Sequence, residues 1–216
     1  MGDSQRRSAA SRLVHAARLL DDSGLNVNAS GNLSIRVDRQ VLVTPSGMAP
    51  AEFDDDDCVL LEHDGTVVHG LRTPTSEWRI HAQVMQRRPD VEAIVHTHSP
   101  EATATATLHQ SIPAVHYLVA RFGGPSLPCA AYATYGSAAL ADNVVTALGQ
   151  HRMACLMASH GAIAVGGDLV TAVALARDVE WFCGVYRRAV ALGEPVILAD
   201  EEVSRVAQKF RSYGQD

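Results

Sequence analysis

Two histidines separated by one residue, His96 and His98, are best placed by type and spacing to do chemistry in this 216-residue chain. They end an apolar stretch that starts at Val91 and is typical of a β-strand, where residues i and i+2 point to the same face. Two imidazoles on one face can bind one metal ion, and neutral imidazole suits zinc. The spacing fits a metal site and equally fits strand histidines that pair with carbonyl groups or water.

A third imidazole is expected from His160, which lies between two apolar runs where a turn would bring it to the end of a sheet. Gly161 is expected to allow the backbone conformation of that turn. Three protein ligands with an open position are typical of a catalytic zinc site, although His160 taken alone also fits a solvated turn. The other seven histidines lack a partner at metal-binding spacing and are interpreted as structural or surface residues: His15, His63, His69, His81, His109, His116 and His151.

Glu77 begins a predicted helix over 77–88 and follows the hydroxyl-rich segment 73–76, in which Thr75 or Ser76 is expected to cap the helix. Free N–H groups and a partial positive charge make a helix N-terminus a site for anions. Glu77 itself is either an ordinary first-turn carboxylate or an acid/base near the metal. Glycine-containing turns at 30–32 and 44–47 are weaker candidates for phosphate binding, because an ordinary turn explains each one alone.

Composition narrows the chemistry and the partners. Lys209 is the only lysine and lies near the C-terminus, which argues against Schiff-base, pyridoxal-phosphate and P-loop chemistry. A formal net charge of -6 gives no reason to expect nucleic acid. The sequence has no signal-peptide pattern and no apolar run of roughly 20 residues, so no membrane partner is expected. Its four separated cysteines predict reduced thiols in a cytoplasmic protein: Cys58, Cys129, Cys155 and Cys183.

Helical and strand patterns alternate along the whole chain and must position these residues. Helices are predicted at 8–20, 77–88, 100–108, 137–148, 169–190 and 200–210. Strands are predicted at 32–37, 40–44, 58–62, 66–68, 91–96, 112–119, 127–131, 153–158 and 162–165. Several neighbouring strands look like hairpins. We therefore expect an α/β fold, a single domain over residues 1–216 with three α/β/α layers and a mixed, largely antiparallel central sheet.

Eight segments, in order and at fitting spacing, resemble the class II aldolase/adducin family, in particular its fuculose-phosphate aldolase branch. They are SGNLSIRV, TPSGM, TPTSEWRIH, EAIVHTHS, IPAVHYLVA, LPCAAYATYG, SHGAIAVG and KFRSYG. The resemblance covers nearly the whole chain. It implies a lyase that cleaves a ketose 1-phosphate, such as L-fuculose 1-phosphate, to dihydroxyacetone phosphate and a small aldehyde such as L-lactaldehyde. The cleavage would pass through a metal-stabilised enediolate.

The resemblance also assigns roles to individual positions. One zinc or other divalent ion per subunit would be bound by His96, His98, His160 and Glu77, and Glu77 would also move the carbon-bound proton. The sugar phosphate would lie among Gly31, Asn32, Ser46, Gly47, Thr75, Ser76 and the aromatic Tyr135. Two further catalytic positions are implied: Tyr117, supplied by a neighbouring subunit of a homotetramer to protonate the aldehyde oxygen, and Tyr213 near the C-terminus.

Alternatives within the same resemblance stay open. An aldolase or dehydratase for a deoxy- or methylthioribulose 1-phosphate shares most of these residues, and Tyr135 and Thr75, where the fuculose branch has phenylalanine and serine, leave the aldehyde undecided. A pentulose-phosphate 4-epimerase would carry aspartate in place of Glu77 and would lack Tyr117. A non-catalytic, adducin-like interaction module would be expected to lose metal ligands that this chain retains.

Overall fold

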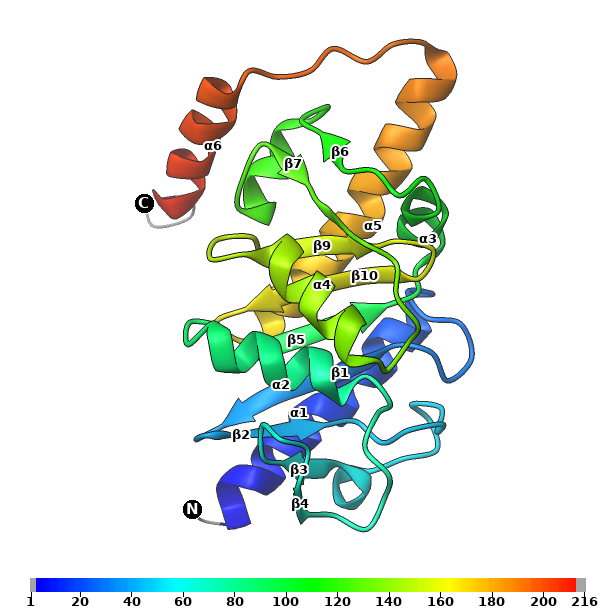
Figure 1. Ribbon diagram of the computed structural model, residues 1–216, viewed down its shortest axis with the longest axis vertical. Coiled ribbons are helices and arrows are strands. Elements are labelled where there is room, and N and C mark those ends of the chain that lie inside the picture. Colours follow the sequence, from blue (N-terminus) through cyan, green and yellow to red (C-terminus); the bar gives the residue numbers. More distant parts are fainter. Residues whose placement is uncertain (1–2, 213–216) are drawn as a thin grey trace.

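The computed structural model describes residues 3–212, in which helices and strands alternate (Figure 1). The α-helices are α1 (Asp3–Asp22), α2 (Trp78–Arg87), α3 (Pro100–Ala106), α4 (Ala138–Leu148), α5 (Leu169–Leu192) and α6 (Asp200–Ser212). Two short 3-10 helices are η1 (Asp55–Asp57) and η2 (Tyr117–Phe122). The strands are β1 (Asn32–Val37), β2 (Gln40–Val43), β3 (Val59–Leu61), β4 (Val67–His69), β5 (Ala93–Thr97), β6 (Ile112–Pro113), β7 (Ser126–Leu127), β8 (Cys129–Ala130), β9 (Ala154–Met157) and β10 (Gly161–Gly166).

Eight of these strands form one sheet in the order β4-β3-β2-β1-β5-β10-β9-β8. All its neighbouring pairs are antiparallel except β8 and β9, which are parallel. Figure 1 shows α2 and α4 on the near face of the sheet and α1 and α5 behind it. The predicted three-layer α/β/α fold with a mixed, largely antiparallel sheet is therefore confirmed, while the extent of one domain over 1–216 stays a prediction.

The strands divide their side chains between two apolar clusters, as the alternation of a pleated strand requires. Leu33 and Val95 belong to the cluster that includes α1, α3 and α5. Val43 and Ile94 belong to the cluster that includes α2 and α4. Because the central strands are covered on both faces, their sequences are almost continuously apolar, and a polar residue within them needs a specific partner.

The sheet register sets the location of the candidate site. β5 lies between β1 and β10, and His96 is directly opposite Asn32 of β1 and Ile163 of β10. Since β1 runs antiparallel to β5, the beginning of β1 lies beside the end of β5. The turn between β9 and β10, which carries His160, lies at the same end of these central strands.

Two local predictions were wrong. The apolar run 112–119 is a two-residue strand followed by η2, which starts at Tyr117 after His116 accepts a hydrogen bond from the Leu118 N–H. Val119 and Phe122 are both fully buried at the three-residue spacing of a 3-10 turn, so tertiary packing overrides strand propensity. The predicted cap of α2 at Thr75 or Ser76 is also wrong. The helix begins at Trp78, its N-cap is Glu77, and the Glu77 side chain makes no capping hydrogen bond.

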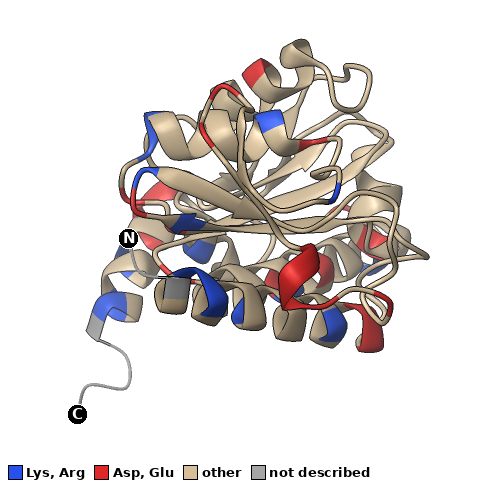
Figure 2. Cartoon of the chain, turned by 90° about the horizontal axis from the view of Figure 1, so that it is seen from below, with Lys and Arg blue, Asp and Glu red and all other residues tan. Residues whose placement is uncertain are grey.

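Figure 2 shows that acidic and basic residues are interspersed along the helices and loops. Among the described residues, no helix is long and apolar enough to cross a membrane. The four cysteines are free thiols, and burial raises the pKa of Cys58 to about 12. Ordinary thiol chemistry is therefore suppressed at Cys58.

Candidate metal centre and its pocket

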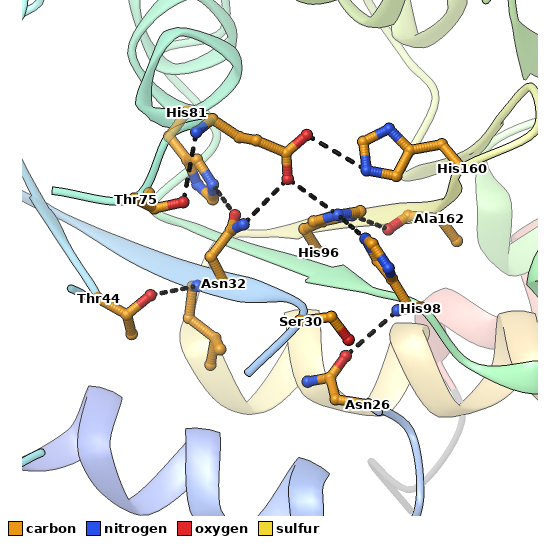
Figure 3. A network of polar contacts seen from close by, with 12 residues as sticks. Asn26, Ser30, Asn32, Thr44, Thr75, His81, His96, His98, His160 and Ala162 are labelled. Atoms are coloured by element: carbon orange, nitrogen blue, oxygen red, sulfur yellow. Dashed lines mark hydrogen bonds and ion pairs between the residues drawn. The ribbon is translucent and has the colours of Figure 1, made fainter. Parts of the chain in front are cut away.

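Three imidazoles and one carboxylate converge at the end of the central strands where β1 begins and β5 ends. His96 Nε2 lies 2.9 Å from His98 Nε2 and 3.0 Å from Glu77 Oε2. Glu77 Oε1 is 3.3 Å from His160 Nε2. Figure 3 shows the three histidine rings turned toward one another, and their centroids are 4.7–4.9 Å apart. The four residues that sequence and resemblance proposed for the metal are thus brought together.

Backbone contacts orient His96, in β5, and His98, directly after it. The Nδ1 of His96 is 2.9 Å from the carbonyl of Ala162 on the neighbouring strand, which fixes the ring so that Nε2 faces the cluster. Just beyond the strand, the His98 backbone N–H donates to the Asn26 side-chain oxygen at 3.2 Å. The two imidazoles therefore project from a backbone tied to β10 and to the loop before β1.

The turn that presents His160 differs in detail from the prediction. Ser159, not Gly161, has the left-handed backbone conformation, with φ of 50°. Gly161 is needed for another reason, because a Cβ there would lie 2.3 Å from the Thr97 carbonyl oxygen. Glycine thus lets β10 lie close against the end of β5, which brings His160 to the other two histidines.

Burial and charge set the protonation of the cluster. Burial raises the pKa of the Glu77 carboxyl, but His96, His160 and Asn32 outweigh it and hold that pKa well below its usual value. Burial lowers the pKa of His96, yet the Glu77 carboxylate raises it above the ordinary value. Burial, and then the charge of His96, lowers the pKa of His98 and of His160 to about 4. Two of the three imidazoles are therefore neutral at pH 7, as metal ligands must be.

The donor set fits a divalent metal ion. One ligand atom from each of Glu77, His96, His98 and His160 lies within 4.8 Å of the others. Glu77 Oε1 is buried, and its 3.3 Å contact with His160 Nε2 is not a hydrogen bond, an arrangement that is costly without a further partner. Three imidazole nitrogens and a carboxylate oxygen are ligands that zinc and other first-row divalent metals accept.

A cavity of about 160 Å³ opens directly above this cluster. Glu77, His98 and His160 line one side of it, while His96 is fully buried behind them. All seven residues predicted to contact the sugar phosphate line the same cavity: Gly31, Asn32, Ser46, Gly47, Thr75, Ser76 and Tyr135. Lys209, the single lysine of the chain, lies in α6 and is not among the lining residues.

Backbone hydrogen bonds hold two of the pocket loops side by side. The Ser46 N–H donates to the Thr73 carbonyl at 2.9 Å, and the Thr75 N–H donates to the Thr44 carbonyl at 3.1 Å. The loop that contains Thr73 and Thr75 runs directly into the ten-residue helix α2. Hydroxyl groups and the N-terminus of this helix therefore face one cavity. Such a helix end carries a partial positive charge that favours an anion.

Known sequences and structures resemble this chain over nearly its full length. A sequence model described as the class II aldolase and adducin N-terminal domain matches residues 11–187. The chain belongs to the class II aldolase and adducin family.

Individual members of the family agree with that assignment. A 5-methylthioribulose-1-phosphate/5-deoxyribulose-1-phosphate aldolase of Rhodospirillum rubrum is 43% identical, covering 94% of this chain and 91% of the relative. An L-fuculose phosphate aldolase of Escherichia coli is 38% identical, covering 97% of each chain. A solved L-fuculose 1-phosphate aldolase superposes with a TM-score of 0.90 at 36% identity, covering 94% of this chain and 96% of the other. The predicted family is confirmed, and the chain is a lyase of the aldolase type.

Neither of the two tyrosines predicted to be catalytic is seen in the pocket: Tyr117 lies outside it in this chain, and Tyr213 is not among the described residues. Tyr117 begins η2, is about half exposed and stacks on Phe210 of α6, with ring centroids 6.1 Å apart. It is not among the residues that line the cavity within this chain. Tyr213 lies outside the described residues. The roles of both tyrosines stay predictions.

Sequence reasoning missed a polar residue behind the aldolase site. Of the two interpretations of His81, structural or surface, the structure agrees with the first: His81 is fully buried, and its Nε2 lies 2.6 Å from Asn32 Oδ1 (Figure 3). Its Nδ1 lies 2.7 Å from Ser34 Oγ, and that hydroxyl is also fully buried. His81 lies four positions after Glu77, the N-cap of α2, and this spacing, which is visible in the sequence, puts both side chains on one helix face.

Proposed function

We propose that this chain is a divalent-metal aldolase, with zinc as the expected ion, that reversibly cleaves a ketose 1-phosphate to dihydroxyacetone phosphate and a small aldehyde. L-Fuculose 1-phosphate, which would release L-lactaldehyde, is the first substrate to test. The observation that carries the proposal is the cluster of Glu77, His96, His98 and His160 at one side of a cavity whose other walls include serine and threonine residues.

The phosphate is proposed to lie where the loops meet the N-terminus of α2. Ser46, Thr75 and Ser76 offer hydroxyl groups there, and the helix end offers partial positive charge. Gly31 and Gly47 keep the walls free of side chains, and both have positive φ, at 80° and 69°. A phosphate bound this way needs no lysine, in agreement with the composition of the pocket.

The chemistry divides between the metal and the side chains. When bound, a divalent ion supplies Lewis-acid stabilisation of the negative charge that develops on the substrate oxygens. In the synthetic direction, Glu77 removes a proton from the hydroxymethyl carbon of dihydroxyacetone phosphate, and that carbon attacks the aldehyde carbonyl. The aldehyde oxygen then takes a proton from Tyr117, and cleavage reverses these steps.

The proposal includes a homotetramer in which Tyr117 reaches the pocket of a neighbouring copy. Two observations support it: the Tyr117 side chain is about half exposed and lies outside the cavity of its own chain. The last residue of α5 and the segment that follows it also expose large apolar side chains, which association of copies would cover, at Leu192, Val196 and Ile197.

A second substrate class is favoured by the Rhodospirillum rubrum relative, whose name specifies 5-methylthioribulose and 5-deoxyribulose 1-phosphates. These ketose 1-phosphates share the first three carbons of fuculose 1-phosphate and differ in the aldehyde released. The bound dihydroxyacetone phosphate half would therefore be the same, and discrimination would fall on groups facing the aldehyde, such as Tyr135.

The deciding experiment measures release of dihydroxyacetone phosphate from the three sugar phosphates side by side. Each reaction is run with the isolated protein, with the protein after chelator treatment, and with zinc restored. Chelator-sensitive release that zinc restores supports the metal aldolase, and the largest kcat/KM identifies the preferred substrate class. Metal-containing protein that releases dihydroxyacetone phosphate from none of the three contradicts the proposal and favours an epimerase or dehydratase.

A further inference from the structure

A chain of hydrogen bonds runs from the interior of the sheet to the carboxylate of the site. Ser34 Oγ lies 2.7 Å from His81 Nδ1, and His81 Nε2 lies 2.6 Å from Asn32 Oδ1. Asn32 Nδ2 lies 3.0 Å from Glu77 Oε2. All four side chains are buried, and those of Ser34 and His81 are fully so.

The direction of this chain follows from the carboxylate. An ionised Glu77 only accepts hydrogen bonds, so the Asn32 amino group must face it and the Asn32 carbonyl oxygen must face His81. His81 therefore donates through Nε2–H, and its Nδ1 accepts from the Ser34 hydroxyl. Burial lowers the pKa of His81 to about 3, so the ring carries a single proton at pH 7.

Metal binding by the neighbouring histidines would reduce the number of hydrogen-bond donors to Glu77. Its carboxylate contacts Asn32 Nδ2 and the Nε2 atoms of His96 and His160. An imidazole that uses Nε2 as a metal ligand cannot also donate a proton from that atom. Of these three contacts, Asn32 alone then remains a hydrogen-bond donor to Glu77, and Asn32 is oriented by His81.

We infer that His81 is a positioning residue of the aldolase, acting through Asn32 to hold the Glu77 carboxylate where it exchanges a proton with the substrate carbon. The inference rests on the proposed function for the proton transfer, and on the hydrogen-bond geometry for the role of His81. Without the His81 donor, the buried Asn32 carbonyl oxygen loses its partner, and the amide rotates to find another. The Glu77 carboxylate then loses its fixed donor.

Two variants separate positioning from packing. His81→Gln can place an amino group near the position of Nε2 and keep the donor to Asn32, whereas His81→Leu has similar volume and no donor. His63→Gln is the matched control, because the half-buried His63 contacts the Ala82 carbonyl of the same helix and no residue of the site. Each protein is loaded with zinc and its metal content is measured.

The main readout is exchange of the hydroxymethyl proton of dihydroxyacetone phosphate with deuterated solvent, which isolates the Glu77 step from the aldehyde. We expect His81→Leu to slow exchange and kcat by about 10- to 100-fold, as loss of a residue supporting a metal site commonly does. Metal content and KM are expected to stay within about two-fold of the wild type, since Ser46, Thr75 and Ser76, which are proposed to hold the phosphate, are unchanged. His81→Gln should recover most of the exchange, and His63→Gln should match the wild type.

A second readout needs neither activity nor a metal. Nitrogen NMR of the metal-free wild-type protein, with the His81 signal assigned by its absence from His81→Gln, reports which ring nitrogen is protonated. A proton on Nε2 alone supports the inference, and a proton on Nδ1 or on both nitrogens overturns it. Exchange by His81→Leu at the wild-type rate also overturns it. Failure of the proposed function gives a different result, because the zinc-loaded wild-type protein would then exchange no proton. In that case the NMR result alone decides the role of His81 in the network.

Discussion

Glu77 Oε2 and His96 Nε2 lie 3.0 Å apart in a site where both side chains are buried. Burial disfavours charge on each group, but the opposite charges stabilise one another, so the pKa of Glu77 falls and that of His96 rises. The pair therefore favours the protonated form of His96, and that proton must leave before Nε2 can bind a metal. Metal uptake and proton release are linked at this one contact.

Zinc affinity is expected to depend on pH through that proton. His96 must be neutral to bind, and its pKa in the metal-free protein is raised, so affinity falls as pH falls through that pKa. Below that pKa, the apparent zinc affinity falls about tenfold for each pH unit, because one proton must be released for each ion bound. Competition with a chelator between pH 8 and pH 6, together with calorimetry in buffers of different ionisation heat, measures both effects. Equal affinity across this range with no proton release would contradict the prediction.

Removal of a metal ligand and removal of the base should have separable effects. His96→Ala is expected to lose both bound metal and turnover. Glu77→Gln keeps three imidazoles, so it should retain metal while turnover falls by about 10²- to 10⁴-fold, the usual contribution of a general base. His69→Ala, at an exposed position on β4, is the control expected to match the wild type. A fully active His96→Ala would refute the site assignment.

Protein stability should fall in mild acid because of His81. Its pKa is lowered from 6.5 to about 3 in the folded state, so the unfolded chain binds a proton that the folded chain does not. The resulting stability is fully present above pH 6.5 and is lost as pH falls toward 3. Between pH 7 and pH 5, the wild type should lose about 2 kcal/mol more unfolding free energy than His81→Gln. Urea unfolding of both metal-free proteins measures the difference, and parallel pH dependences would contradict it.

Gly31→Ala should be more damaging than Gly47→Ala, although both glycines have positive φ. A Cβ at Gly31 would lie 2.3 Å from Asn26 Oδ1, the acceptor for the His98 N–H, whereas Gly47 faces open space. Both variants should lose about 1 kcal/mol of stability to backbone strain. Gly31→Ala should lose more, and its zinc affinity should also fall. Urea unfolding and zinc titration of the pair give the comparison, and equal losses would exclude the proposed clash.

Two inactive variants should restore activity when their chains associate. If Tyr117 serves a neighbouring pocket, a mixture of Tyr117→Phe and His96→Ala chains, unfolded together and refolded, forms some sites with both residues intact. About a quarter of sites qualify at equal proportions, since each draws its two parts from independently chosen chains. Aldol cleavage is assayed in the mixture and in each variant refolded alone. Mixed oligomers without recovered activity would place Tyr117 outside the shared site.

The sequence predicted those parts of the molecule that depend on local periodicity. The strand preceding His96 and His98 and the helix that begins beside Glu77 have regular patterns, and i, i+2 spacing alone puts the two histidines on one face. Resemblance in several motifs then supplied the pocket residues, all of which line one cavity.

The errors lie where long-range contacts decide. Tyr117 belongs to a 3-10 helix because Val119 and Phe122 pack into the core, which no local pattern revealed. His81 appeared unpartnered because Ser34 and Asn32 lie 47 and 49 positions away from it in the chain. Gly161 is required by the carbonyl of Thr97, a contact that exists only after β10 has paired with β5.

The origin of the four clustered ligands has a consequence for biogenesis. Glu77 is the N-cap of α2, His96 comes from β5, His98 follows β5 directly, and His160 comes from the turn before β10. During synthesis, a nascent chain that ends before this turn lacks the last ligand, however well its first strands have paired. Complete coordination therefore awaits the β5–β10 pairing, and tight retention of metal would mark chains that have finished this central step of folding.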